Sequence, residues 1–161
     1  MEKIVFLTPH FAVAGQLEAE DFSEAARLGF KVIINNRPDG EEEHQLPNQI
    51  AAAHALRSAL SYHYIPSGKL DLFSDQVVDA SETALAAADG PVLAYCRSGT
   101  RCAIIWAAVS ARSLPVDEVV AALLSAGFDF DFLRDDLEQQ AAAGSQYAGR
   151  RDDGAALREA A

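Results

Sequence analysis

Residues 92–101 read Val-Leu-Ala-Tyr-Cys-Arg-Ser-Gly-Thr-Arg, a strand-like run followed by a loop with one cysteine. Its first four residues form a short apolar run that predicts a buried strand, and the next six form a tight loop. Residues 102–109 are then apolar on every face of a helix, so this helix must be buried all round. In a parallel sheet, ligands bind at the carboxyl ends of the strands, so the loop lies where a ligand site is expected.

The same alternation of short apolar runs and longer helical patterns extends through most of the chain. We expect strands at residues 3–8, 11–14, 31–36, 62–66 and 92–95, and helices at residues 19–28, 48–59, 73–88, 100–113, 117–125 and 128–140. This rhythm predicts an α/β fold with a mostly parallel sheet of about four to five strands and helices on both faces. The predicted domain covers residues 1–140, and residues 141–161 are expected to form a frayed or disordered tail.

The composition limits the class of protein. The chain has 161 residues, half of them apolar, which fits one domain with a single core. Its net charge of −11 repels nucleic acid and anionic lipid, so neither nucleic acid nor a membrane is expected as a partner. No apolar run approaches the roughly 20 residues of a membrane span, and the N-terminal one is too short for a signal peptide. Two cysteines without an export signal predict a cytoplasmic location.

Cys96 is predicted to be a catalytic nucleophile. A helix N-terminus behind it and the neighbouring cations Arg97 and Arg101 should lower its thiol pKa, and the thiolate is the reactive form. Arg101 is expected to fork onto two oxygens of a bound oxyanion, so the substrate should carry an anionic group. The loop residues expected to surround that anion are Arg97, Ser98, Gly99 and Thr100. The alternative is an inert buried cysteine at a strand end.

Other polar residues follow the predicted strand 31–36 on the same rim. Arg37 and Asp39 belong to an Arg-Pro-Asp-Gly turn, and they either only shape that turn or brace the cysteine loop and contact substrate. Residues 41–44 read Glu-Glu-Glu-His, and they are expected to form a solvated edge, or else to repel wrong anions or select a cationic end of the substrate. Cys102 is either a small buried filler or a resolving thiol for Cys96. The histidines show no metal-ligand spacing, and no metal or cofactor is expected.

Four motifs resemble the DUF442 family, which is the phosphatase-like domain of beta-lactamase hydrolase-like proteins. In order they are Ala-Gly-Gln-Leu at 14–17, Val-Ile-Ile-Asn-Asn-Arg-Pro-Asp-Gly-Glu at 32–41, Tyr-Ile-Pro at 64–66 and Gly-Pro followed by the cysteine stretch at 90–101. The loop itself resembles those of tyrosine and dual-specificity phosphatases and of rhodaneses. The resemblance covers residues 3 to about 130 and implies a tyrosine-phosphatase-like fold. It also implies that Arg37 or Asp39 contacts the loop or the substrate.

The length of the loop leaves two chemistries open. Tyrosine-specific phosphatases have five residues between cysteine and arginine, whereas four residues separate Cys96 from Arg101 here, and Cys102 stands at the phosphatase arginine position. A six-residue loop is the rhodanese length, which suits a persulfide sulfur. A phosphatase also needs a general acid to protonate the leaving oxygen. Asp71 is the available carboxylate after the Ile-Pro motif, although it comes two residues later than the resemblance implies, and a solvated role is its alternative.

Three functions from different classes follow. The first is a cysteine-dependent phosphatase-like hydrolase, in which Cys96 forms a thiophosphate intermediate, Arg101 holds the phosphoryl oxygens and Asp71 supplies the proton. The second is a rhodanese-type sulfurtransferase that carries a persulfide on Cys96. The third is a non-catalytic module that binds anions or docks a partner. The expected ligand is accordingly an anionic small molecule or phosphoprotein, or a donor of sulfane sulfur.

Overall fold

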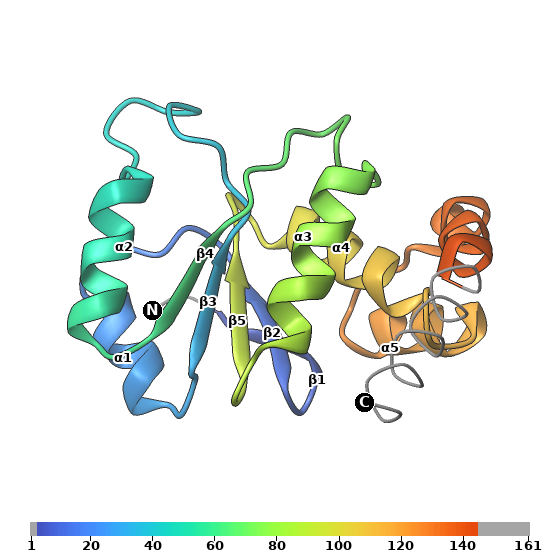
Figure 1. Ribbon diagram of the computed structural model, residues 1–161, viewed down its shortest axis with the longest axis horizontal. Coiled ribbons are helices and arrows are strands. Elements are labelled where there is room, and N and C mark those ends of the chain that lie inside the picture. The colour runs from blue at the N-terminus through green and yellow to red at the C-terminus, as the bar shows by residue number, and fades with distance from the viewer. Residues whose placement is uncertain (1–2, 145–161) are drawn as a thin grey trace, which may run out of the picture. The chain divides into compact units, whose positions relative to one another are not determined.

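A computed structural model describes residues 3–144, and five strands in it form one sheet in the order β1-β2-β5-β3-β4 (Figure 1). The strands are β1 (Val5–Thr8), β2 (Phe11–Ala14), β3 (Val32–Asn35), β4 (Ser61–Tyr64) and β5 (Val92–Tyr95). β1 runs antiparallel to β2, and the other neighbours are parallel. The predicted mostly parallel α/β sheet is therefore confirmed. β5 occupies the centre and all four of its residues are buried, as its continuous apolar run requires.

The register of the sheet brings four strand ends to one edge. Tyr95 at the end of β5 pairs with Ala14 of β2 on one side and with Asn35 of β3 on the other. Asn35 in turn pairs with Tyr64, the last residue of β4. The loops that follow these four strands consequently begin side by side. This edge is where the predicted cysteine loop lies, because that loop begins directly after Tyr95.

Helices cover both faces of the sheet. They are α1 (Asp21–Arg27), α2 (Asn48–Arg57), α3 (Asp75–Ala86) and α4 (Thr100–Ser110). α1 and α2 lie on one face and α3 on the other (Figure 1). Under α1 and α2, the core packs Phe22 and Ala51 of the helices against Ile33, Leu93 and Tyr95 of the strands. The helix predicted to be buried all round is largely so, since six of its residues 102–109 are buried and the other two are half-buried.

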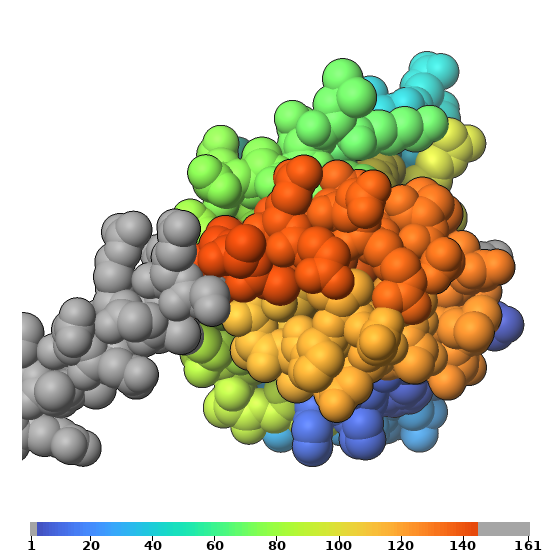
Figure 2. Space-filling view, turned by 90° about the vertical axis from the view of Figure 1, so that its right-hand side faces the viewer, coloured from blue at the N-terminus to red at the C-terminus, as the bar shows by residue number. Residues whose placement is uncertain are grey.

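The chain divides into two compact units, the first ending at Trp106 and the second starting at Ala107. The second contains the end of α4, α5 (Val116–Ser125), the 3-10 turn η1 (Asp131–Leu133) and a helix over residues 134–144, which share one surface (Figure 2). Arg134 links these elements, because its guanidinium pairs with Asp117 and Asp131.

The last predicted helix differs in detail from the observed one. It was expected at 128–140, but it starts with the 3-10 turn at Asp131 and continues through residue 144. Of the predicted tail, residues 145–161 lie outside the described part of the chain. From residue 3 to residue 144, no helix has both the length and the apolar character that crossing a bilayer requires.

Candidate active site at the cysteine loop

The cysteine loop connects β5 to α4 and is shaped by Gly99. Gly99 has a φ of +90°, a left-handed conformation that L side chains rarely adopt. A Cβ at this position would also lie 3.3 Å from the carbonyl oxygen of Ala14 in β2. The glycine therefore lets the loop press against β2 while it turns back. As a result the Gly99 N–H donates a hydrogen bond of 3.1 Å to the Cys96 sulfur.

Cys96 is a thiolate at neutral pH. Its pKa is lowered from an ordinary 9.0 to about 5, although its side chain is completely buried and burial alone would raise the pKa. The largest cause is a hydrogen bond from the thiol of Cys102, followed by hydrogen bonds from the backbone N–H groups of Cys102, Ser98 and Gly99. The lowered pKa was expected, but its leading causes are these short-range donors and not the arginines.

Cys102 has the opposite character to Cys96. It is buried in the first turn of α4, and burial, together with the neighbouring negative sulfur of Cys96, raises its pKa well above the ordinary value. Cys102 therefore remains a thiol and acts as a hydrogen-bond donor to Cys96. Both cysteines are free in this structure. The residue six positions after Cys96 thus stabilises the negative charge on the Cys96 sulfur.

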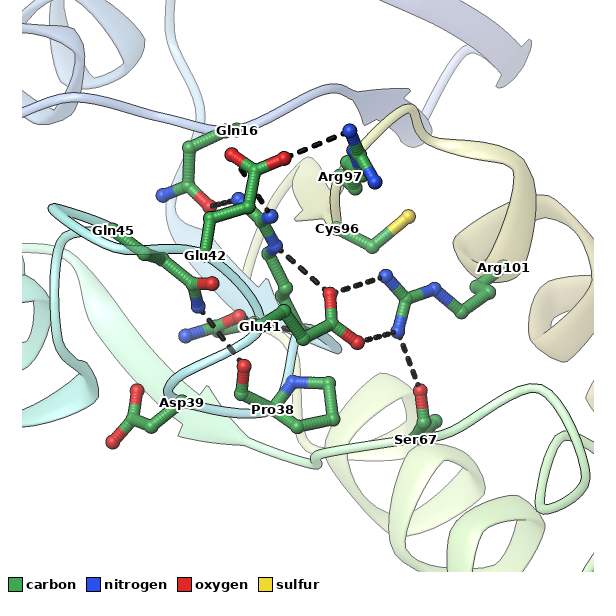
Figure 3. Close-up of polar contacts among 12 residues, drawn as sticks. Gln16, Pro38, Asp39, Glu41, Glu42, Gln45, Ser67, Cys96, Arg97 and Arg101 are labelled. Atoms are coloured by element: carbon green, nitrogen blue, oxygen red, sulfur yellow. Dashed lines mark hydrogen bonds and ion pairs between the residues drawn. The ribbon is translucent and has the colours of Figure 1, made fainter.

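Arg101 extends from α4 across the edge of the sheet. Its Nη1 donates to the Ser67 carbonyl at 2.9 Å and to Glu41 at 2.8 Å, and its Nη2 donates to the other oxygen of Glu41 at 2.8 Å (Figure 3). This is the planar two-point contact that a guanidinium makes with a carboxylate. Arg101 thus holds both carboxylate oxygens of Glu41, a side chain of the same protein, and its contact with a bound oxyanion stays a prediction.

Arg37 is a second cation of the site. Only 2 % of its side chain is exposed, its Nε donates to Glu41 at 2.9 Å and its Nη1 donates to Gln16 at 2.9 Å. Its Nη2 is buried without a hydrogen-bond partner, and it forms an ion pair with Glu42 at 3.5 Å. Of the two roles considered for Arg37, the geometry favours contact with the site over a turn-forming role.

Glu41 and Glu42 were not among the predicted site residues. Glu41 lies between Arg101 and Arg37, and Glu42 pairs with Arg97 at 2.8 Å (Figure 3). Contact first with Arg101 and then with Arg37 lowers the pKa of Glu41 to about 2, so it is ionised and cannot supply a proton at neutral pH. Both residues are exposed, as a solvated edge requires, and they also pair with the arginines of the site. Their position after β3 was the available signal, since β3 ends beside β5 at the shared edge.

The remaining loop residues are exposed. Arg97 has 69 % of its side chain exposed, and its contact is the ion pair with Glu42. Ser98 and Thr100 bond to each other through their hydroxyls at 3.1 Å. The backbone N–H of Ser98, not its hydroxyl, donates a hydrogen bond to the Cys96 sulfur.

Asp39 and Asp71 are not brought to the cysteine loop. Asp39 accepts a hydrogen bond from the backbone N–H of Asn48 and its own N–H donates to the Tyr64 hydroxyl, so it shapes the start of α2. Asp71 is exposed and lines a hollow of about 300 Å³ between the end of β4 and the first turns of α3. A Cβ at Gly68, in the same loop, would lie 3.2 Å from a carboxylate oxygen of Asp71. The contact between this loop and the site is the hydrogen bond that the Ser67 carbonyl accepts from Arg101.

Comparisons with known proteins place the chain among relatives. Residues 3–113 match the family described as beta-lactamase hydrolase-like protein, phosphatase-like domain. A beta-lactamase hydrolase-like protein of Xylella fastidiosa strain 9a5c is 36% identical over 141 residues, which are 86% of this chain and 32% of that protein. The chain spans about a third of the length of the curated relatives it matches.

Solved structures show the same fold. A candidate phosphatase from Neisseria meningitidis Z2491 superposes with a TM-score of 0.73 at 33% identity, covering 85% of this chain and 97% of that one. PTPMT1 superposes with a TM-score of 0.68 and covers 92% of this chain and 99% of its own, at 9% identity. The second likeness concerns the fold alone, which is tyrosine-phosphatase-like.

Proposed function

Because the chain belongs to the family of the phosphatase-like domain of beta-lactamase hydrolase-like proteins, we propose that it hydrolyses phosphate esters through a thiophosphate intermediate on Cys96. The family and the structural neighbours support a phosphatase-like function. The observation that carries the cysteine mechanism is the Cys96 thiolate, with its pKa near 5, at the carboxyl end of the central strand.

In the proposed reaction the Cys96 sulfur attacks phosphorus, a sulfur–phosphorus bond forms and the bond to the ester oxygen breaks. The leaving oxygen takes the electron pair, together with a proton where its basicity requires one. Water then attacks the thiophosphate, which releases inorganic phosphate and restores the thiolate. The N–H groups that surround the sulfur and the guanidinium of Arg101 stabilise the charge on the phosphoryl oxygens.

Asp71 is the acid that we propose for esters with basic leaving groups. Its loop follows β4, and the Ser67 carbonyl of the same loop already contacts Arg101. The exposed carboxylate of Asp71 matters only where the departing oxygen needs a proton. An aryl phosphate such as p-nitrophenyl phosphate has a leaving group that departs without one.

The test uses two esters and two variants. We expect Cys96→Ser to abolish hydrolysis of both p-nitrophenyl phosphate and an alkyl phosphate. Asp71→Asn should lower kcat by about 10²-fold for the alkyl ester, the usual size of a general-acid contribution, and leave the aryl ester nearly unchanged. Turnover that survives Cys96→Ser would refute the cysteine mechanism. An equal effect of Asp71→Asn on both esters would remove Asp71 from the acid role.

A second candidate function is sulfur transfer, and the loop length favours it. Four residues separate Cys96 from Arg101, one fewer than in tyrosine-specific phosphatases. Here the Cys96 sulfur would attack the outer sulfur of thiosulfate, sulfite would leave and a Cys96 persulfide would remain. Intact mass after incubation with thiosulfate tests this reaction. A gain of one sulfur that is absent in Cys96→Ala supports it, and the unchanged mass of both proteins would exclude it.

A further inference from the structure

The nucleophile is covered in this structure. Cys96 has no exposed surface, Arg37 has almost none, and Arg101 is 13 % exposed. The segment beside these residues is the pair Glu41 and Glu42, which we call the acidic strap. A phosphoryl group would have to reach the Cys96 sulfur and the guanidinium groups at this place.

The strap contacts all three arginines of the site. Glu41 accepts hydrogen bonds from Arg101 and from Arg37, and Glu42 forms its ion pairs with Arg97 and Arg37 (Figure 3). No other member of the glutamate run does this, because Glu43 is 90 % exposed and has His44, at 4.0 Å, as its partner in the described part of the chain. The strap is therefore two specific carboxylates and not a general acidic surface.

The formal charges of the site balance while the strap is in place. Arg37, Arg97 and Arg101 carry three positive charges, and the two strap carboxylates with the Cys96 thiolate carry three negative ones. A dianion that entered this arrangement would add two uncompensated negative charges to a buried site, which is unfavourable. If the strap leaves, the arginines exceed the thiolate by two charges, which matches a phosphate monoester dianion.

Arg37 also has a donor without a hydrogen bond. Its Nη2 group is buried and lacks a hydrogen-bond partner, an arrangement that is costly and uncommon in proteins. The contact of this group is the longer ion pair with Glu42, at 3.5 Å. Such a buried donor is suited to an oxygen of a bound anion.

We propose that Arg37, Arg97 and Arg101 form a binding site for a dianionic group, and that the acidic strap fills this site until a ligand displaces it. The inference rests on the proposed function insofar as the ligand is the phosphoryl group of the substrate. Arg37 is then a substrate-binding residue, and Glu41 and Glu42 act as an internal competitor. The competing explanation is that Glu41 only orients Arg101, in which case its loss weakens anion binding.

The test follows alkylation of Cys96 by iodoacetamide at pH 7, with the modified residue identified by peptide mass. We expect the double variant Glu41→Gln, Glu42→Gln to react at least tenfold faster than the natural chain because the sulfur is uncovered. A lower pKa of Cys96 in the double variant cannot cause such a gain, because Cys96 is already ionised at pH 7. Glu43→Gln is the matched control, and its rate should equal that of the natural chain.

Protection by inorganic phosphate gives the second readout. The phosphate concentration that halves the alkylation rate should fall at least tenfold in the double variant and stay unchanged in Glu43→Gln. Thermal unfolding checks that the double variant is folded. If it is folded and the half-protecting phosphate concentration is unchanged or higher, the proposal is overturned. Neither readout needs turnover. If the natural chain does not hydrolyse phosphate esters, the proposed function is therefore refuted, but the proposed anion site is not.

Discussion

The contact between the two cysteines leads to a prediction about the pKa of Cys96. The difference between the ordinary value of 9.0 and the value of about 5 corresponds to about 5 kcal/mol in favour of the thiolate. The thiol of Cys102 is the largest cause, ahead of three backbone N–H groups. A hydrogen bond to a charged group contributes about 1.5–3 kcal/mol, and a thiol is a weak donor. We therefore expect Cys102→Ala to raise the pKa of Cys96 by about one unit.

The assay is the pH dependence of Cys96 alkylation, with thiolate absorbance as a second measure. The natural chain should show a midpoint near pH 5, and Cys102→Ala should shift the midpoint upward. Cys102→Ser is the matched control, because its hydroxyl keeps a donor at nearly the same place and should preserve most of the lowered pKa. Thermal unfolding of each variant checks that the buried site is intact. A midpoint in folded Cys102→Ala that equals or falls below that of the natural chain would refute the reasoning.

Two further predictions concern stability. Gly99→Ala should destabilise the chain by about 1–3 kcal/mol, because it combines a left-handed φ with a close approach to Ala14; Gly29→Ala, with a φ of +100° and nothing within 4 Å, should cost about 1 kcal/mol in the same urea titration. Glu41 has a pKa lowered from 4.5 to about 2, so its ion pairs stabilise the fold above pH 4.5 and are lost as the pH falls towards 2. Between pH 4.5 and pH 2, the unfolding free energy of Glu41→Gln should therefore fall by about 2 kcal/mol less than that of the natural chain, after allowance for solvent screening. Parallel curves of unfolding free energy against pH for the two proteins would contradict this.

The sequence allowed the fold to be predicted well because its strands are short apolar runs between clear turn residues. Residues 11–14 and 92–95 were expected as strands and have those bounds in the structure, and the buried helix after the cysteine loop was also expected. The ends of other elements were less accurate. A helix was expected over residues 73–88, yet α3 starts at Asp75 and ends at Ala86. Gly90, after that helix, leaves room for the side chain of Lys31.

The site was predicted less completely because its contacts join distant parts of the chain. Cys96 and Arg101 could be identified within one loop, and Arg37 from its place after a strand. The partners of those arginines could not, since Gln16 and Glu41 lie 21 and 60 residues away from the arginines they bind. A run of three glutamates has the composition of a solvated surface, and nothing in it marks the two that pair with arginines. Asp71 lies near the Ile-Pro motif in sequence but lines a hollow beside α3 in the structure, and its role as an acid stays a prediction.

The parallel register of the strands also affects how the protein folds. The β1–β2 hairpin joins strands that are neighbours in sequence, whereas Arg101 contacts Ser67 and Glu41 across 34 and 60 residues. Contacts of long sequence separation carry a large loop-closure entropy, and the β1–β2 hairpin can pair long before they form. The arginine side chains and their partners thus come together only after β5, β3 and β4 have paired. An anion held by them stabilises the native state and not its precursors. Such a ligand should slow unfolding and leave the refolding rate unchanged.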